Sequence, residues 1–225
     1  MQYMKITFVT LGCKVNQYET AAMEELLRER GHEIVAQGEA ADAVVVNTCA
    51  VTAESARKSR QAFRRAKKQN PGAVMVLCGC FSQADRAAAE ALGADYIGGS
   101  GERREIVEFL CGEAERRVLL PDAFSRRVFE ELPAGGSEFR TRAMLKVQDG
   151  CKNFCTYCII PYLRGPSRSL PVETAERQAA ELRELGYREI VMTGIEISSY
   201  GPDVGSSFAE LVERYSELLS GEENA

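Results

Sequence analysis

Apolar, β-branched runs alternate with helix-forming runs along the first 120 residues of this 225-residue chain. This order predicts parallel strands, because neighbouring parallel strands need a long crossover connection that is usually a helix. Val44, Val45 and Val46 are typical of a strand buried on both faces. The sequence therefore predicts an α/β fold whose N-terminal part is an open parallel sheet with helices on both faces. The expected strands are residues 5–10, 43–47, 73–77 and 95–97, and the expected helices are residues 18–30, 53–69, 83–92 and 102–110.

A second unit follows a polar stretch that contains Pro133 and the run Gly135-Gly136-Ser137. Such composition is typical of a linker between domains. Beyond it the pattern predicts two further βα units, which fit the start of a parallel (β/α) barrel. Their strands are expected at residues 143–147 and 189–193 and their helices at residues 172–185 and 208–219. We therefore divide the chain into a first domain at residues 1–121, a linker at 122–140 and a second domain at 141–225.

Composition favours an ordinary globular protein, with 45% hydrophobic and 27% charged residues. The sequence shows no basic leader and no apolar run of membrane length, so we expect a cytoplasmic protein without a membrane partner. In that reducing compartment eight cysteines favour metal ligation over disulfides. A net charge of −5 argues against attraction of the whole protein to nucleic acid but permits a local basic patch.

Three cysteines, Cys151, Cys155 and Cys158, are separated by gaps of three and two residues. Three thiolates leave one iron of a four-iron cluster open to an outside ligand. The alternative is a zinc site, but structural zinc normally takes four ligands and no second short cysteine pair follows. The single histidine, His32, is distant, and its place after Gly31 predicts a surface position. The spacing therefore favours an iron–sulfur cluster.

Three other cysteines, Cys13, Cys49 and Cys80, each follow one of the expected strands. The ends of parallel strands meet at one edge of the sheet, so these thiols should converge there. Each also precedes a helix, whose N-terminus favours thiolate over thiol. We therefore expect a second three-thiolate site, the alternative being small residues packed at strand ends. Cys78 could compete with Cys80 as a ligand. Cys111, at the end of an expected helix, is expected to be a core or surface residue without a ligand role.

Five segments in order resemble the methylthiotransferase family of radical S-adenosylmethionine enzymes, and the resemblance runs through nearly the whole chain. They are residues 10–19 (TLGCKVNQYE), 46–52 (VNTCAVT), 79–83 (GCFSQ), the segment from 140–143 (RTRA) to 158–165 (CIIPYLRG), and 193–201 (TGIEISSYG). The first and last are most similar to the branch that acts on threonylcarbamoyladenosine at position 37 of tRNA. The nearest alternatives are the branch that acts on isopentenyladenosine-37 and the branch that acts on an aspartate of a ribosomal protein.

The resemblance implies two 4Fe-4S clusters and S-adenosyl-L-methionine as cofactors. The cluster on Cys151, Cys155 and Cys158 would cleave S-adenosylmethionine to a radical that takes hydrogen from C2 of the adenine. The cluster on the first cysteine set would present the sulfur, and a second S-adenosylmethionine would supply the methyl group. The resemblance also implies tRNA as a partner, together with an electron donor such as a flavodoxin or ferredoxin.

Further residues are candidates for binding S-adenosylmethionine and tRNA. Tyr157 in the cysteine loop, and Gly194 and Glu196 after a strand of the expected barrel, are placed to contact S-adenosylmethionine. Cations on one face of the expected helix 53–69 could bind tRNA phosphates, although a solvated helix face is the alternative. These cations are Arg57, Arg60, Arg64, Lys67 and Lys68.

The chain departs from the family in length. A complete barrel of eight units needs about 250 residues, whereas residues 141–225 hold only two units, and the RNA-binding domain that usually follows in the family is missing. We therefore expect an incomplete fragment, inactive or nearly so by itself. A function of another class stays open, namely a non-catalytic iron–sulfur or zinc-binding module.

Overall fold

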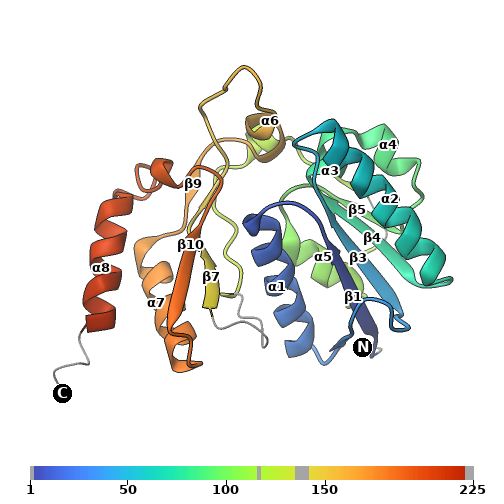
Figure 1. Cartoon of the computed structure of the whole chain (residues 1–225), viewed down its shortest axis with the longest axis horizontal. Coiled ribbons are helices and arrows are strands. Elements are labelled where there is room, and N and C mark those ends of the chain that lie inside the picture. The colour runs from blue at the N-terminus through green and yellow to red at the C-terminus, as the bar shows by residue number, and fades with distance from the viewer. Residues whose placement is uncertain (1–2, 116–117, 135–141, 221–225) are drawn as a thin grey trace.

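The first unit is a parallel sheet of six strands, in the order β2-β1-β3-β4-β5-β6 (Figure 1). The computed structural model describes residues 3–115, 118–134 and 142–220. Strand β2 lies on one side of β1, and the next strand in the chain, β3, lies on the other side. In open α/β sheets, ligands bind at the point where the strand order reverses in this way. The strands are β1 (Lys5–Thr10), β2 (Glu33–Ile34), β3 (Ala43–Thr48), β4 (Val74–Gly79), β5 (Tyr96–Gly98) and β6 (Val118–Leu119).

Helices cover both faces of this sheet. On one face α1 (Lys14–Glu29) and α5 (Arg103–Leu110) bury apolar side chains against alternate residues of β1, β3 and β4. On the other face α2 (Ala53–Gln69) packs Phe63, which is fully buried, against the remaining residues of those strands. The predicted α/β fold with helices on both faces is confirmed.

Three details of the first unit differ from the sequence prediction. The first helix, expected at residues 18–30, begins earlier, at Lys14. The helix expected at 83–92 is two short helices, α3 (Cys80–Ala84) and α4 (Arg86–Glu90), because the chain breaks at Asp85. The Asp85 side chain accepts a hydrogen bond from the Ala88 amide and so caps the second helix. Strands β2 and β6 were not predicted, since each is only two residues long and too short to show a period.

The second unit contains the parallel pair β7 (Arg142–Lys146) and β10 (Glu189–Thr193), connected through α7 (Val172–Glu184). Its last described helix is α8 (Phe208–Ser220), and α7 and α8 bury apolar residues such as Ala179 and Leu211 against β7 and β10. An antiparallel pair, β8 (Gln148–Asp149) and β9 (Arg168–Ser169), encloses the cysteine loop and the short helix α6 (Ile160–Arg164).

The described part of the polar stretch, residues 122–134, is packed between the two units. It contains a 3₁₀ turn at Ala123–Ser125 and the buried residues Phe129 and Leu132. The Leu132 carbonyl accepts hydrogen bonds from the Tyr18 hydroxyl of the first unit and the Gln178 amide of the second. The remainder of the predicted linker lies outside the described residues, and the division into domains stays a prediction.

Two further observations concern sequence expectations. His32 is buried rather than exposed, because the chain after α1 turns it inward to within 3.5 Å of the buried Cys111 thiol. None of the helices in the described part of the chain is long and apolar enough to cross a membrane.

Candidate metal centres

The first cysteine set lies at the C-terminal edge of the large sheet. Cys13 stands at the N-cap position of α1, shortly after β1; Cys49 directly follows β3, and Cys80 begins α3 directly after β4. These three strands are neighbours in the sheet, so their ends are adjacent. The Cys80 thiol is close enough to Cys13 and Cys49 for both to act on it electrostatically. The structure therefore brings the three predicted residues to one edge.

Two glycines allow the chain to come this close. Gly12 has a φ of +105°, and a Cβ there would lie 3.0 Å from the Cβ and 3.3 Å from the Sγ of Cys49. Gly79 has a φ of +102°, and a Cβ there would lie only 2.5 Å from the Thr48 carbonyl oxygen. Any larger residue would meet both the steric contact and an unfavourable backbone conformation. The edge is therefore shaped by residues that directly precede Cys13 and Cys80.

Burial changes the protonation of the thiols near this edge. It raises the pKa of Cys80, although the nearby Arg164 guanidinium opposes the change. For Cys80, burial therefore acts against the thiolate that the N-terminus of α3 is expected to favour. Cys78 packs within the core on the α1 face, where burial raises its pKa to about 11. It therefore belongs to the hydrophobic core.

The second cysteine set occupies the loop between β8 and α6. Cys151 is buried, Cys155 is exposed and Cys158 is half-buried. The Cys151 amide donates to the Gly165 carbonyl at 3.0 Å, and the Cys158 amide donates to the Cys155 carbonyl at 2.9 Å. Gly150, with a φ of +74°, leaves no room for a Cβ, which would lie 2.1 Å from the Pro166 carbonyl oxygen. The start and end of the loop are thus held against each other.

The donor atoms of each set fit an iron–sulfur cluster better than zinc. Each set offers three thiols, which matches a four-iron cluster with one open iron and falls one ligand short of a structural zinc site. Among residues 3–115, 118–134 and 142–220, no three Cys, His, Asp or Glu side chains already surround a common point at metal-binding distance. A four-iron cluster makes a different demand, since each thiolate binds a separate iron and the three thiols need not meet at one point.

The residues predicted to bind S-adenosylmethionine are only partly brought together. Glu196 lies near the cysteine loop, since Asn153 donates to its carboxylate at 3.4 Å. Gly194 packs so closely on Gln148 that a Cβ would lie 2.9 Å from Oε1. Tyr157, in contrast, is 91% exposed and points into solvent. Their role toward S-adenosylmethionine stays a prediction.

Gln148 connects the end of β10 with the cysteine loop, a function the sequence did not reveal. Its Oε1 accepts from the amides of Ile195 and Glu196 at 2.9 and 2.8 Å. Its Nε2 donates to the carbonyls of Asp149 and Gly150 at 3.1 and 2.7 Å. One buried amide thus holds both loops.

A buried cluster of charged side chains joins the two units and was also missed. At its centre, Glu19 on α1 accepts from Arg103 at 2.8 Å, Lys146 at 3.1 Å and Arg164 at 2.8 Å. Asp149 accepts from Lys146 at 3.0 Å and from Arg164 at 3.1 Å. All five side chains are less than one-tenth exposed. Charges this deep persist only when paired and hydrogen-bonded.

The same cluster sets the protonation of its carboxylates. Burial alone would raise the pKa of Glu19, but Arg103, Arg164 and Lys146 outweigh it and hold that pKa well below its usual value. The pKa of Asp149 is likewise lowered, because Lys146 and Arg164 outweigh its burial. Both groups are therefore ionised at neutral pH. The sequence contained a partial signal, since Glu19 and Arg164 lie within two of the segments that resemble the family.

The cations predicted to form one stripe on α2 differ in their surroundings. Arg57 pairs with Glu54 at 2.6 Å, and Arg60 lies over the Phe81 ring at 5.6 Å. Lys67 donates to the Gly93 carbonyl at 2.7 Å. The other two, Arg64 and Lys68, are exposed, and their side chains have no hydrogen-bond or ion-pair partner in the described part of the chain.

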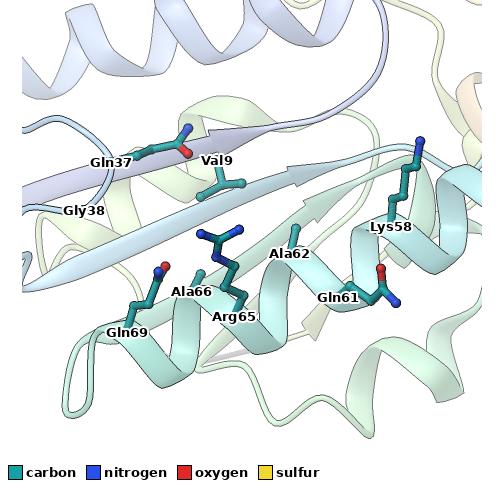
Figure 2. Close-up of a pocket in the computed structure, with 9 residues that line it drawn as sticks. All are labelled: Val9, Gln37, Gly38, Lys58, Gln61, Ala62, Arg65, Ala66 and Gln69. Carbon is teal, nitrogen blue, oxygen red and sulfur yellow. The ribbon is translucent and has the colours of Figure 1, made fainter.

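A polar pocket of about 670 Å³ lies beside this stripe, between α2 and the sheet (Figure 2). Figure 2 shows the Arg65 guanidinium directed toward Val9 of β1, with Gln37 on the opposite wall. Lys58, which precedes Arg65 along α2, adds a second cation to the lining. The pocket is lined by Val9, Gln37, Gly38, Lys58, Gln61, Ala62, Arg65, Ala66 and Gln69.

Comparison with known proteins identifies the class. Residues 145–224 match the model of the radical SAM superfamily, and residues 5–98 match that of the uncharacterized protein family UPF0004. The second unit, with its cysteine loop, therefore contains a radical SAM segment. The chain is similar to the methylthiotransferases among the radical SAM enzymes, as the relatives described next indicate.

One relative is the threonylcarbamoyladenosine tRNA methylthiotransferase MtaB of Bacillus subtilis, which is 41% identical over 96% of this chain and 49% of its own length. The protein of the same name in Aquifex aeolicus is 36% identical over 93% of this chain and 52% of its own length. A tRNA-2-methylthio-N(6)-dimethylallyladenosine synthase of Pelotomaculum thermopropionicum is 32% identical over 93% and 49%. The chain thus spans about half the length of the curated relatives it matches.

A solved structure supports the fold. The radical S-adenosylmethionine methyltransferase TsrM of Kitasatospora setae, with tryptophan substrate and a SAM analogue bound, superposes with a TM-score of 0.62. The superposition covers 97% of this chain and 52% of that chain at 14% sequence identity. At this identity the likeness extends to the fold alone.

Proposed function

We propose that this chain forms part of a methylthiotransferase that modifies C2 of N6-threonylcarbamoyladenosine at position 37 of tRNA. The observation that carries the proposal is the pair of three-cysteine sets, one at the sheet edge and one in the loop before α6. Two such sets fit the two clusters that radical methylthiotransferases use. The branch is supported by the identities of 36–41% to the two MtaB proteins against 32% to the dimethylallyladenosine synthase.

Each cysteine set has a separate role in this proposal. Cys151, Cys155 and Cys158 would hold the cluster that binds S-adenosylmethionine, and Cys13, Cys49 and Cys80 would hold the second cluster. When bound, these cofactors supply the radical, the sulfur and the methyl group, while the protein orients them and excludes water. The Glu196 carboxylate, which accepts from Asn153 of the cysteine loop, would accept a hydrogen bond from S-adenosylmethionine at the mouth of that loop.

The basic face of α2 is the proposed contact with tRNA. Arg64 and Lys68 are exposed without protein partners in the described residues, so phosphates would not have to displace an existing ion pair. The neighbouring pocket adds Lys58 and Arg65 on the adjacent side of the helix (Figure 2). We also propose a flavodoxin or ferredoxin as electron donor and a cytoplasmic location, in line with the substrate.

Charge reversal tests the tRNA contact. Replacing Arg57, Arg60 and Arg64 by Glu should weaken tRNA binding and flatten its dependence on salt, because each lost phosphate contact lowers the slope by about one. Arg177→Glu on α7 is the matched control, since Arg177 is equally exposed and also pairs within its helix. Equal binding by the triple variant and the control would remove α2 from the tRNA site.

Metal content and tRNA selectivity test the function itself. After anaerobic reconstitution we expect about eight irons per chain and thiolate-to-iron absorption. We also expect tighter binding to tRNA that carries threonylcarbamoyladenosine than to tRNA that carries isopentenyladenosine. The reverse preference would favour the isopentenyladenosine branch. One or two zincs without colour would instead support a non-catalytic metal-binding module.

A further inference from the structure

Arg164 lies at the junction of the two units and is 1% exposed. It is the last residue of α6, and its side chain reaches α1 of the first unit. Its Nη1 donates to Glu19 Oε1 at 2.8 Å and to Asp149 Oδ1 at 3.1 Å. Its Nη2 donates to Asn16 Oδ1 at 2.9 Å. The planar fork of a guanidinium suits such divergent partners, which a single ammonium cannot reach together.

Asn16 extends this contact to the first cysteine set. Its Nδ2 donates to the Leu11 carbonyl at 2.7 Å and to the Thr48 carbonyl at 3.0 Å. Leu11 comes two residues before Cys13, and Thr48 directly precedes Cys49. One buried amide therefore holds the two cysteine-bearing segments together. Because Arg164 can only donate, it also fixes which end of the Asn16 amide faces the two carbonyls.

On its other side Arg164 is equally close to the second cysteine set. Asp149, which it contacts, lies two residues before Cys151. Gly165, the next residue in the chain, accepts the hydrogen bond of the Cys151 amide at 3.0 Å. A path of hydrogen bonds between 2.7 and 3.1 Å thus runs from one cysteine set to the other through Arg164 and Asn16.

We propose that Arg164 is a positioning residue that, through Asn16, fixes the loops of Cys13 and Cys49 relative to the loop of Cys151. The proposal rests on the proposed function in so far as both sets hold clusters. A reaction between groups held at two centres depends on their separation, and small displacements are costly. Buried guanidinium groups with several fixed partners are well suited to hold such a separation.

Arg103 provides the matched comparison for a role limited to stability. It is also fully buried and also pairs with Glu19, at 3.2 and 2.8 Å. Its remaining bonds go to the carbonyls of Gly99 and Gly101. Within the described residues it forms no hydrogen bond with Asn16 or Asp149. A substitution there perturbs the charge cluster and leaves the path between the cysteine sets intact.

The first test compares Arg164→Lys, Asn16→Ala and Arg103→Lys after anaerobic reconstitution of the whole chain. For Arg164→Lys we expect about eight irons, with a weakened magnetic interaction between the two reduced clusters in the electron paramagnetic resonance spectrum. Asn16→Ala should retain only about four irons, since the first set loses its brace. Arg103→Lys should lower the unfolding temperature yet keep both iron content and magnetic interaction. Equal spectral changes in Arg103→Lys and Arg164→Lys would overturn the proposal.

A second measurement uses the protein without metal and does not depend on the proposed function. Alkylation of Cys49, which is 7% exposed, should accelerate about tenfold in Asn16→Ala and in Arg164→Lys, as expected for the loss of one hydrogen bond. In Arg103→Lys the rate should equal that of the wild type. Unchanged rates in the first two variants would refute the positioning role even if the wild type bound two clusters. Failure of the wild type to bind two clusters would instead refute the proposed function.

Discussion

Replacing Glu19 by Gln tests how the buried charges hold the two units together. Glu19 is 1% exposed and neutralises cations from both units, with Arg103 at 2.8 Å, Arg164 at 2.8 Å and Lys146 at 3.1 Å. The amide keeps the shape of the carboxylate but removes its charge. After the change Asp149 still faces Lys146 and Arg164. The Arg103 guanidinium, in contrast, loses its bonded carboxylate and keeps the neutral amide oxygen of residue 19 and the carbonyls of Gly99 and Gly101.

The cost follows from this geometry. Removing one partner of a buried ion pair costs about 3–5 kcal/mol, because an uncompensated charge stays in the interior. For a chain of this size each 1 kcal/mol corresponds to roughly 2–4 °C in the unfolding midpoint. We therefore expect Glu19→Gln to lower the midpoint by about 6–20 °C. A cost of this size is a large part of the stability of an average domain, about 5–15 kcal/mol.

The pH dependence gives a second signature. The pKa of Glu19 is lowered in the folded protein, so its contribution to stability is present above the unfolded value of about 4.3 and is lost as the pH falls below it. Wild-type stability should thus decline below about pH 4.3. Glu19→Gln should decline less steeply in this range, with a residual slope from Asp149, whose pKa is also lowered.

Urea and thermal unfolding followed by circular dichroism from pH 2 to 7 measure both effects. Glu54→Gln is the control, since Glu54 pairs with Arg57 on the exposed surface of α2 and should leave the midpoint unchanged. A midpoint for Glu19→Gln that matches the control at pH 7, or an acid slope that matches the wild type, would refute the reasoning.

Further predictions concern single sites. Gly79→Ala should prevent the first cysteine set from binding iron, because the new Cβ would lie 2.5 Å from a backbone oxygen. Gly72→Ala is the control, since a Cβ there meets open space, and equal iron content in both variants would contradict the prediction. In the metal-free protein at pH 8, mass spectrometry should find the exposed Cys13 and Cys155 alkylated first and Cys78 last, since burial raises the pKa of Cys78 to about 11. Gln148→Leu should cost about 1–3 kcal/mol in urea unfolding by leaving two amides at the end of β10 without their acceptor; an unchanged midpoint would argue against that brace.

The sequence predicted the layered architecture because its main signals are local. Buried strands such as Val44–Val46 and the opposite faces of α2 are visible as runs and periods. The short strands β2 and β6 and the break at Asp85 carry no such signal, since two residues show no period and a capped junction differs little from a continuous helix. The inward turn of His32 depends on packing against Cys111, which lies far along the chain.

The cysteine positions were predictable for a different reason than the groups that support them. Topology alone places the ends of β1, β3 and β4 at one edge. Glu19, Lys146 and Arg164, in contrast, are far apart in sequence and occur in helix or strand patterns where charged residues are usually exposed. Only the tertiary arrangement reveals that they are partners.

The buried charge cluster has a consequence for dissecting the protein. Glu19 and Arg103 belong to the first unit, while Lys146, Asp149 and Arg164 belong to the second. Cutting the chain between the units would leave the Arg103–Glu19 pair alone on the first piece. The second piece would carry two cations, Lys146 and Arg164, with one carboxylate, Asp149. On both pieces, apolar surface that is now buried would become exposed to solvent. The two halves should therefore resist separate expression, and exchanging one half for that of a distant homologue should succeed only when the complementary charges are transplanted with it.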